Sequence, residues 1–161
     1  MKMLSQFFFY VLVISTMACQ KNPKILDAKN SKNAAVVTHV VVTGGEGSYT
    51  FSVTLESPDT GCNQYADWWE VISADGTTLI YRRILAHSHV SEQPFIRSGG
   101  VVAIAANQEV IVRGHMNPMG YGAGVNTMKG TVVGGFQTFE VAADFAATLE
   151  KAAPQPSGCA F

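Results

Sequence analysis

The sequence predicts an all-β domain, an antiparallel β-sandwich of immunoglobulin-like architecture with one short C-terminal helix. Three observations lead to this fold class. Hydrophobic residues recur with a period of two from residue 36 onward, and turn-forming residues separate these short runs. The composition, 47% hydrophobic and 14% charged residues, supplies enough apolar side chains for a packed core. A chain of 161 residues has the length of one ordinary domain.

Alternation is clearest in the first half of the domain. In the run 49–55, large apolar residues alternate with threonine and serine, the pattern of a strand buried on one face. The run 57–61 contains serine, proline, aspartate and glycine, which ends that strand. Asp75-Gly76 is a hairpin turn between two further runs, because glycine accepts the positive φ that such turns need. The predicted strands are 36–42, 49–55, 68–72 and 78–85.

The second half of the chain contains further strands and the helix. The runs 101–105 and 109–116 are predicted to pair as a hairpin across Asn107-Gln108, and 131–136 is a candidate last strand. Apolar residues then recur at helical spacing, with Pro154 beyond them, which predicts a helix over 139–152.

The first 19 residues have the three parts of a secretory signal. Lys2 is a positive start, Phe7–Ile14 is an unbroken apolar run, and mostly small residues follow up to Ala18. The apolar run is too short for a membrane-spanning helix, which needs about 20 residues.

Cys19 directly follows Ala18, and this pair resembles the lipobox of bacterial lipoproteins, in which a small residue precedes a cysteine that is lipidated and becomes N-terminal. Thr16 stands where that motif usually has leucine. The resemblance implies a signal peptide at 1–18, a lipid anchor on Cys19 and a domain in the cell envelope outside the cytoplasm. The alternatives are an ordinary signal peptide and an uncleaved anchor.

The lysine- and asparagine-rich stretch up to residue 35 is predicted to be a flexible tether. The division is therefore 1–18 signal peptide, 19–35 lipidated cysteine and tether, and 36–161 β-sandwich domain.

The sequence contains three cysteines, and lipidation of Cys19 leaves an even pair. Outside the cytoplasm, Cys62 and Cys159 are then expected to form a disulfide. The alternative is two free thiols, one of them a metal ligand.

The formal net charge of −1 excludes a basic surface for nucleic acid, whose phosphates require clustered lysine and arginine. The expected partners are the membrane, through the lipid anchor, and an envelope protein or glycan.

Histidines gather in two segments that hairpins bring to strand ends. His87 and His89 point to one face if their segment is extended, and His115 closes a later strand. Imidazoles with thioethers favour copper, whereas imidazoles with a carboxylate favour zinc. The alternative is ordinary hydrogen-bonded histidines and core methionines. The predicted copper or zinc ligands are His87, His89, His115, Met116, Met119 and Glu92.

An aromatic group, Tyr65, Trp68 and Trp69, is a candidate surface for a ligand such as a glycan. Alternation requires that one tryptophan face the core. The sequence contains no nucleophile elbow, zinc-protease motif, phosphate loop or dinucleotide motif, so no catalytic residue is predicted. A binding module is therefore favoured over an envelope hydrolase or other enzyme.

Overall fold

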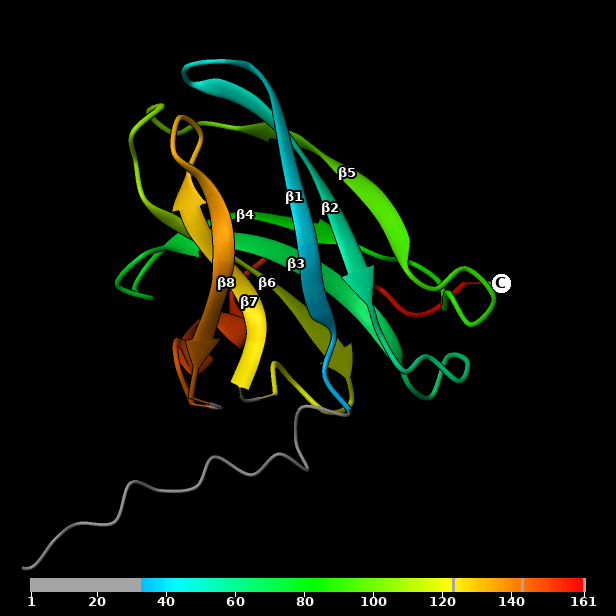
Figure 1. Cartoon of the computed structure of the whole chain (residues 1–161). Helices are drawn as coiled ribbons and strands as arrows, with labels where there is room; N and C mark the ends of the chain where they lie inside the picture. Colours follow the sequence, from blue (N-terminus) through cyan, green and yellow to red (C-terminus); the bar gives the residue numbers. More distant parts are fainter. Residues whose placement is uncertain (1–32, 123, 143, 161) are drawn as a thin grey trace, which may run out of the picture.

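The computed structural model describes residues 33–122, 124–142 and 144–160, which form two antiparallel sheets packed face to face (Figure 1). The predicted all-β sandwich is therefore confirmed. The predicted signal peptide, the lipidation site and nearly all of the tether lie outside the described residues. No helix in the described part of the chain is long and apolar enough to cross a membrane.

The smaller sheet has the strand order β1-β2-β5 and the larger one β4-β3-β6-β7-β8. This is the immunoglobulin-like arrangement with β8 added at one edge, because strands one, two and five oppose the sheet that contains strands three, six and seven. The short 3-10 helix η1 follows β8. The bounds are β1 Val36–Gly45, β2 Ser48–Glu56, β3 Tyr65–Ser73, β4 Leu79–Ile84, β5 Phe95–Val102, β6 Val110–Asn117, β7 Gly124–Thr131, β8 Gly135–Val141 and η1 Ala147–Lys151.

The core lies between the sheets and contains the inward residues of both. Trp69 on β3 is fully buried there, as the central tryptophan of such sandwiches is. Ala34 and Ala35 are also buried, so the packed domain begins before residue 36. Burying an aliphatic or aromatic side chain contributes about 1.5–3 kcal/mol, which makes this layer the main source of stability.

Two strand predictions are wrong in the second half of the domain. β5 pairs with β2 and β6 pairs with β3, so the segments predicted to form one hairpin belong to different sheets. The predicted strand 131–136 is instead a turn flanked by β7 and β8. Local alternation does not reveal that a connection crosses from one sheet to the other, and this is the cause of the first error.

The predicted helix over 139–152 is also wrong, apart from the short helix η1. β8 continues to Val141 because its residues pair with β7, as Phe139 does with Thr127. Beyond β8, the segment 144–160 crosses the outer face of the larger sheet, and we name it the C-terminal strap. Two buried arginines donate hydrogen bonds to several carbonyl groups of the strap, and these contacts hold the segment against the sheet along a path that is helical only at η1.

These arginines belong to a buried ion triad under the strap. Glu70 on β3 lies opposite Arg82 on β4 and Arg113 on β6, and its two carboxylate oxygens each accept a hydrogen bond of 2.8 Å from one guanidinium Nε. Glu70 is 0% exposed, Arg113 1% and Arg82 5%. The remaining guanidinium N–H groups donate to carbonyls of the strap at Phe145, Ala146, Leu149, Glu150, Ala152 and Pro154.

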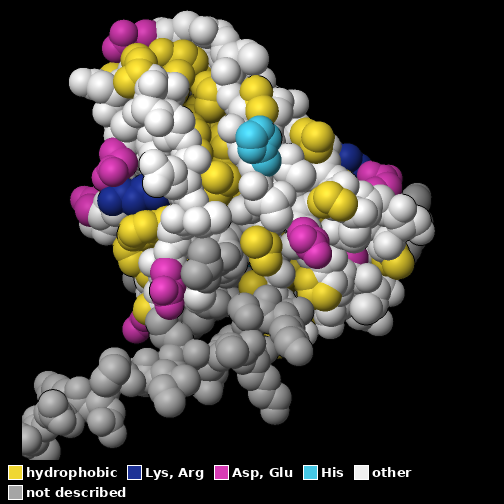
Figure 2. Space-filling model, in the orientation of Figure 1, with side chains coloured by type: hydrophobic (Ala, Val, Ile, Leu, Met, Phe, Trp, Pro, Cys, Tyr) yellow, Lys and Arg dark blue, Asp and Glu magenta, His cyan; other side chains and the backbone are white. Residues whose placement is uncertain are grey.

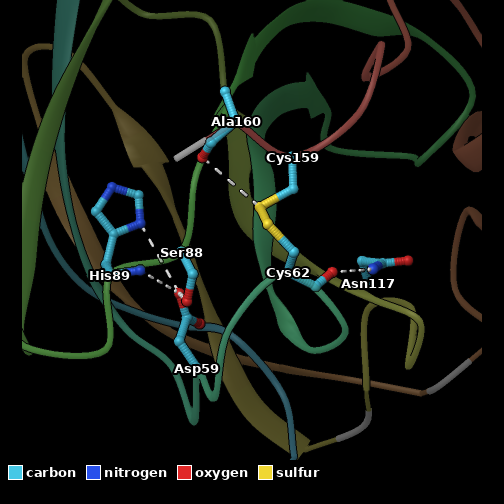
Figure 3. Close-up of a disulfide and its surroundings, with 7 residues drawn as sticks. All are labelled: Asp59, Cys62, Ser88, His89, Asn117, Cys159 and Ala160. Atoms are coloured by element: carbon cyan, nitrogen blue, oxygen red, sulfur yellow. Dashed lines mark hydrogen bonds and ion pairs between the residues drawn. A yellow bond between two sulfur atoms is a disulfide. The ribbon is translucent and has the colours of Figure 1, made fainter.

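The disulfide predicted between Cys62 and Cys159 is confirmed. Their Cα atoms are 5.5 Å apart, and the bond joins the β2–β3 connection to the end of the strap. Figure 3 shows this bond, with Asn117 donating a hydrogen bond to the carbonyl of Cys62. The strap is therefore attached to the sandwich by ion-triad hydrogen bonds at its centre and covalently at its end.

The outer face of the smaller sheet has a different chemistry. Its cross-strand rows consist of small polar and aliphatic residues, and Val41, Ile96 and Val101 are exposed there. In Figure 2 the side of β1, β2 and β5 is largely apolar or uncharged around one histidine. The buried glutamate and its two arginines lie on the other side of the sandwich, beneath the strap.

We expect Glu70→Gln to destabilise the fold by about 3–5 kcal/mol, because two buried guanidinium groups lose their counter-charge. Urea denaturation measures this change. The matched control is Glu92→Gln, which breaks the half-exposed pair with Arg97 and should cost less than about 1 kcal/mol. Equal losses in the two variants would contradict the importance of the triad.

Replacing both cysteines of the disulfide by serine should lower the free energy of unfolding by about 4.7 kcal/mol in the chain-entropy model, because the bond spans 97 residues. Denaturation of oxidised wild type and of the Cys62→Ser/Cys159→Ser variant gives the difference. A loss below about 1 kcal/mol would show that the ion triad alone fixes the strap.

Candidate functional site

A cavity of about 470 Å³ lies between the edge of the strap and the end of the larger sheet at which β3 begins and β6 ends. We name it the strap cavity. Its volume is in the range typical of small-molecule sites. The disulfide and residues of the strap line it together with side chains from β3 and β6. The lining residues are Cys62, Tyr65, Asp67, Trp68, His115, Asn117, Glu150, Lys151, Gln155, Pro156, Gly158 and Cys159.

A carboxylate–imidazole pair forms the polar centre of the cavity. A bulge in β3 places Asp67 as an extra residue between Ala66 and Trp68, and its Oδ1 lies 2.6 Å from Nδ1 of His115. On the other side of the ring, Nε2 lies 3.3 Å from Oε1 of Glu150 in the strap. Asp67 and His115 are buried, whereas the Glu150 side chain is 46% exposed.

Trp68 contributes its edge to the cavity, because both faces of its indole are covered. His115 from β6 stacks on it with ring centroids 3.6 Å apart, and the Arg82 guanidinium from β4 lies 4.4 Å from the ring centroid. Since β4 and β6 flank β3, these contacts come from opposite sides. Trp68 is 3% exposed and Trp69 is in the core, so the tryptophans do not form an exposed stacking platform.

Tyr65 lines the same cavity and is 3% exposed. Burial raises the pKa of its phenol, and the negative charges of Asp67 and Asp59 raise it further. The phenol therefore stays protonated at neutral pH and presents a hydrogen-bond donor. The predicted ligand residues Tyr65 and Trp68 thus lie at one cavity, whereas Trp69 does not line it.

His87 and His89 form a second group, in the β4–β5 connection. Their ring centroids are 4.5 Å apart, and His89 stacks on Phe95 at 3.8 Å. His89 is 1% exposed, and both of its ring nitrogens lack a hydrogen-bond partner. Asp59 accepts a 2.8 Å hydrogen bond from the backbone N–H of His89, as Figure 3 shows. Burial lowers the pKa of His89, and the charges of Arg97 and His87 lower it further.

The structure does not assemble the predicted three-histidine metal site. Within residues 33–122, 124–142 and 144–160, no group of three or more His, Cys, Asp or Glu side chains is arranged to hold a metal ion. His115 instead contacts carboxylates of β3 and the strap.

The other three predicted metal ligands lie in different surroundings. Met116 is fully buried in the core, and Glu92 pairs with Arg97 at 2.7 Å. Met119 is 47% exposed.

The chain is similar to one curated protein of Halomicrobium mukohataei described as a "Putative lipoprotein". The two are 41% identical over 91 residues, which is 56% of this chain and 44% of the relative. The chain therefore spans less than half the length of that relative. No family model matches the chain, and no solved structure matches it.

Sequence reasoning missed two contacts of the cavity centre, those of His115 with Glu150 and with Asp67. Glu150 lies in the segment predicted as a helix, and its approach to His115 depends on the path of the strap. Asp67 was visible beside the aromatic residues, but its direction depends on the bulge. The sequence signal was an acidic residue next to two tryptophans in a strand.

The lowered pKa of His89 predicts a pH dependence of stability. The unfolded chain binds a proton here at higher pH than the folded chain does, so the free energy of unfolding falls as the pH drops below about 6.5. His89→Gln should lose less stability than wild type between about pH 7 and pH 5. Chemical denaturation at both pH values measures this. His39→Gln, which alters an exposed histidine, should behave as wild type.

Proposed function

We propose that this protein is a lipid-tethered binding protein of the cell envelope that takes a small hydrophilic ligand in the strap cavity. The observation that carries the proposal is the Asp67–His115 pair, a buried and oriented polar group at the wall of a cavity of about 470 Å³. Small-molecule sites combine a concave surface with a few fixed polar groups.

The lining supports recognition by hydrogen bonds. Both faces of Trp68 are already covered, so a sugar ring or other flat ligand would not stack on it. The space is lined instead by the carboxylate of Glu150, the amide of Asn117, the ammonium group of Lys151 and the phenol of Tyr65. Such donors and acceptors suit a hydroxyl-rich or zwitterionic ligand, a class that includes glycans.

Two observations support the envelope and the anchor. The sequence Ala18-Cys19 resembles a lipobox, and the chain is similar to a protein described as a "Putative lipoprotein". The Cys62–Cys159 disulfide fits an oxidising compartment, since structural disulfides are rare in the cytosol.

Ligand binding is tested by NMR titration of the mature protein with glycans, amino acids and short peptides, in the presence of a chelator. We expect saturable shifts of the Trp68 indole N–H and the Asn117 amide. His115→Gln should weaken binding at least about tenfold, because it removes a charge-capable hydrogen-bonding group worth about 1.5 kcal/mol or more. The control His39→Gln lies on the smaller sheet and should bind as wild type does.

The absence of any saturable shift across such a panel, or shifts confined to residues outside the cavity, would contradict the proposed binding site.

Lipidation is tested separately by mass spectrometry of the protein produced in a host with lipoprotein processing. We expect an N-terminal acylated Cys19 and the loss of residues 1–18. Several acyl chains hold a protein stably at a membrane, since each buried CH₂ contributes about 0.8 kcal/mol. Cys19→Ser should release the protein from the membrane fraction. An unmodified or uncleaved N-terminus would contradict the anchor.

A further inference from the structure

His115 has a carboxylate oxygen at each ring nitrogen. Nδ1 lies 2.6 Å from Asp67 Oδ1, and Nε2 lies 3.3 Å from Glu150 Oε1. A neutral imidazole carries only one N–H. When that N–H is donated to Asp67 Oδ1, the lone pair of Nε2 faces a carboxylate oxygen 3.3 Å away. A second ring proton, or a metal ion between the two atoms, would then bridge them.

The separation of these two atoms fits a shared metal ion. Zinc–nitrogen bonds are about 2.0–2.1 Å and zinc–oxygen bonds about 2.0–2.2 Å, so two such ligand atoms at a tetrahedral angle lie about 3.4 Å apart. The observed distance from Nε2 to Oε1 is 3.3 Å. The ligand atoms would therefore need little rearrangement.

Asp67 occupies the position that a supporting carboxylate has in metal sites. A metal-binding histidine nearly always donates its second ring N–H to a carboxylate or carbonyl, which fixes the ring and its tautomer. Here the bulge of β3 and the stacking of Trp68 hold His115 with Nε2 directed to the strap. The ring is thus held in a metal-binding orientation by residues that would not contact the ion.

We propose that the strap cavity holds a divalent transition-metal ion, zinc or copper, bound by His115 Nε2 and a carboxylate oxygen of Glu150. This names the ligand class of the cavity and so rests on the proposed function. The protein supplies two ligands, and the remaining coordination positions face the cavity, where water or a small ligand completes them. A site of this kind needs only two protein ligands, so it does not require a third ligating side chain in the cavity.

The charges around the site are compatible with a cation. Asp67 and Glu150 each contribute a negative charge, and Lys151, also in the lining, contributes one positive charge. The two nearby guanidinium groups, Arg82 and Arg113, are both paired with Glu70.

The histidine pair of the β4–β5 connection is less suited to a metal. The rings of His87 and His89 are tilted by only 35° with centroids 4.5 Å apart, so they lie over one another. Asp59 Oδ2 is 3.8 Å from His89 Nδ1 and already accepts the backbone N–H of that residue. This pair provides the internal control for the experiment.

The test is calorimetric titration of the mature protein, extracted from membranes in detergent and freed of metal with a chelator, with Zn²⁺ and Cu²⁺. We expect one saturable site per chain. Bound Cu²⁺ should also quench Trp68 fluorescence, because the indole stacks on the ligating ring at 3.6 Å. His115→Gln should abolish the site, and Glu150→Gln should weaken it at least about tenfold, by loss of an anionic ligand.

Glu150→Gln is the decisive variant, because its side chain is half-exposed and the fold does not depend on its charge. His87→Ala is the matched control and should retain wild-type affinity and quenching. The absence of saturable binding, unchanged binding in Glu150→Gln, or loss of binding in His87→Ala would overturn the metal site.

The NMR titration under chelator separates this result from the proposed function. Ligand shifts at Trp68 and Asn117 without any metal binding would leave a metal-free binding cavity in which His115 only hydrogen-bonds to the two carboxylates. Metal binding without organic ligands would identify the ion itself as the ligand.

Discussion

The carboxylate of Glu70 lies between two guanidinium groups, and all three side chains are removed from water. Burying charges costs several kcal/mol for each ion, and pairing offsets this only if the other polar hydrogens also find acceptors. Arg82 and Arg113 find them in backbone carbonyls of the strap. The strap therefore completes the ion triad, and the triad in turn determines where the strap can lie on the sheet.

The candidate site follows from this arrangement. The strap runs as an irregular chain with one short turn, η1, and the two arginines donate to its carbonyls along this path. That turn places Glu150 next to His115, while the disulfide, which also lines the cavity, holds the end of the strap. A loosened triad should thus change the cavity before it changes the core, because the core packs on the other face of the sheet.

The sequence predicts the sandwich, the first four strands and the disulfide, because these depend on local alternation, turn chemistry and cysteine parity. Glu70 inside an apolar strand indicates a buried partner. Its position opposite Arg82 depends on a register shift between Val71 and Ile72, which a regular hairpin through Asp75-Gly76 does not predict. The contact of His115 with Glu150 could not be predicted, because it depends on how the strap crosses the sheet. The helical spacing of alanines after residue 139 led to a wrong helix prediction, because the path of the strap across the sheet cannot be read from that spacing.

The chain reaches the sandwich at the same end as the cavity. Ala35 packs closely on β6, because a Cβ added at Gly114 would lie only 2.8 Å from the Cβ of Ala35. Gly114 immediately precedes His115. β1 therefore begins on the core side of β6, the strand that carries His115, and its lower end in Figure 1 lies near the end of β6.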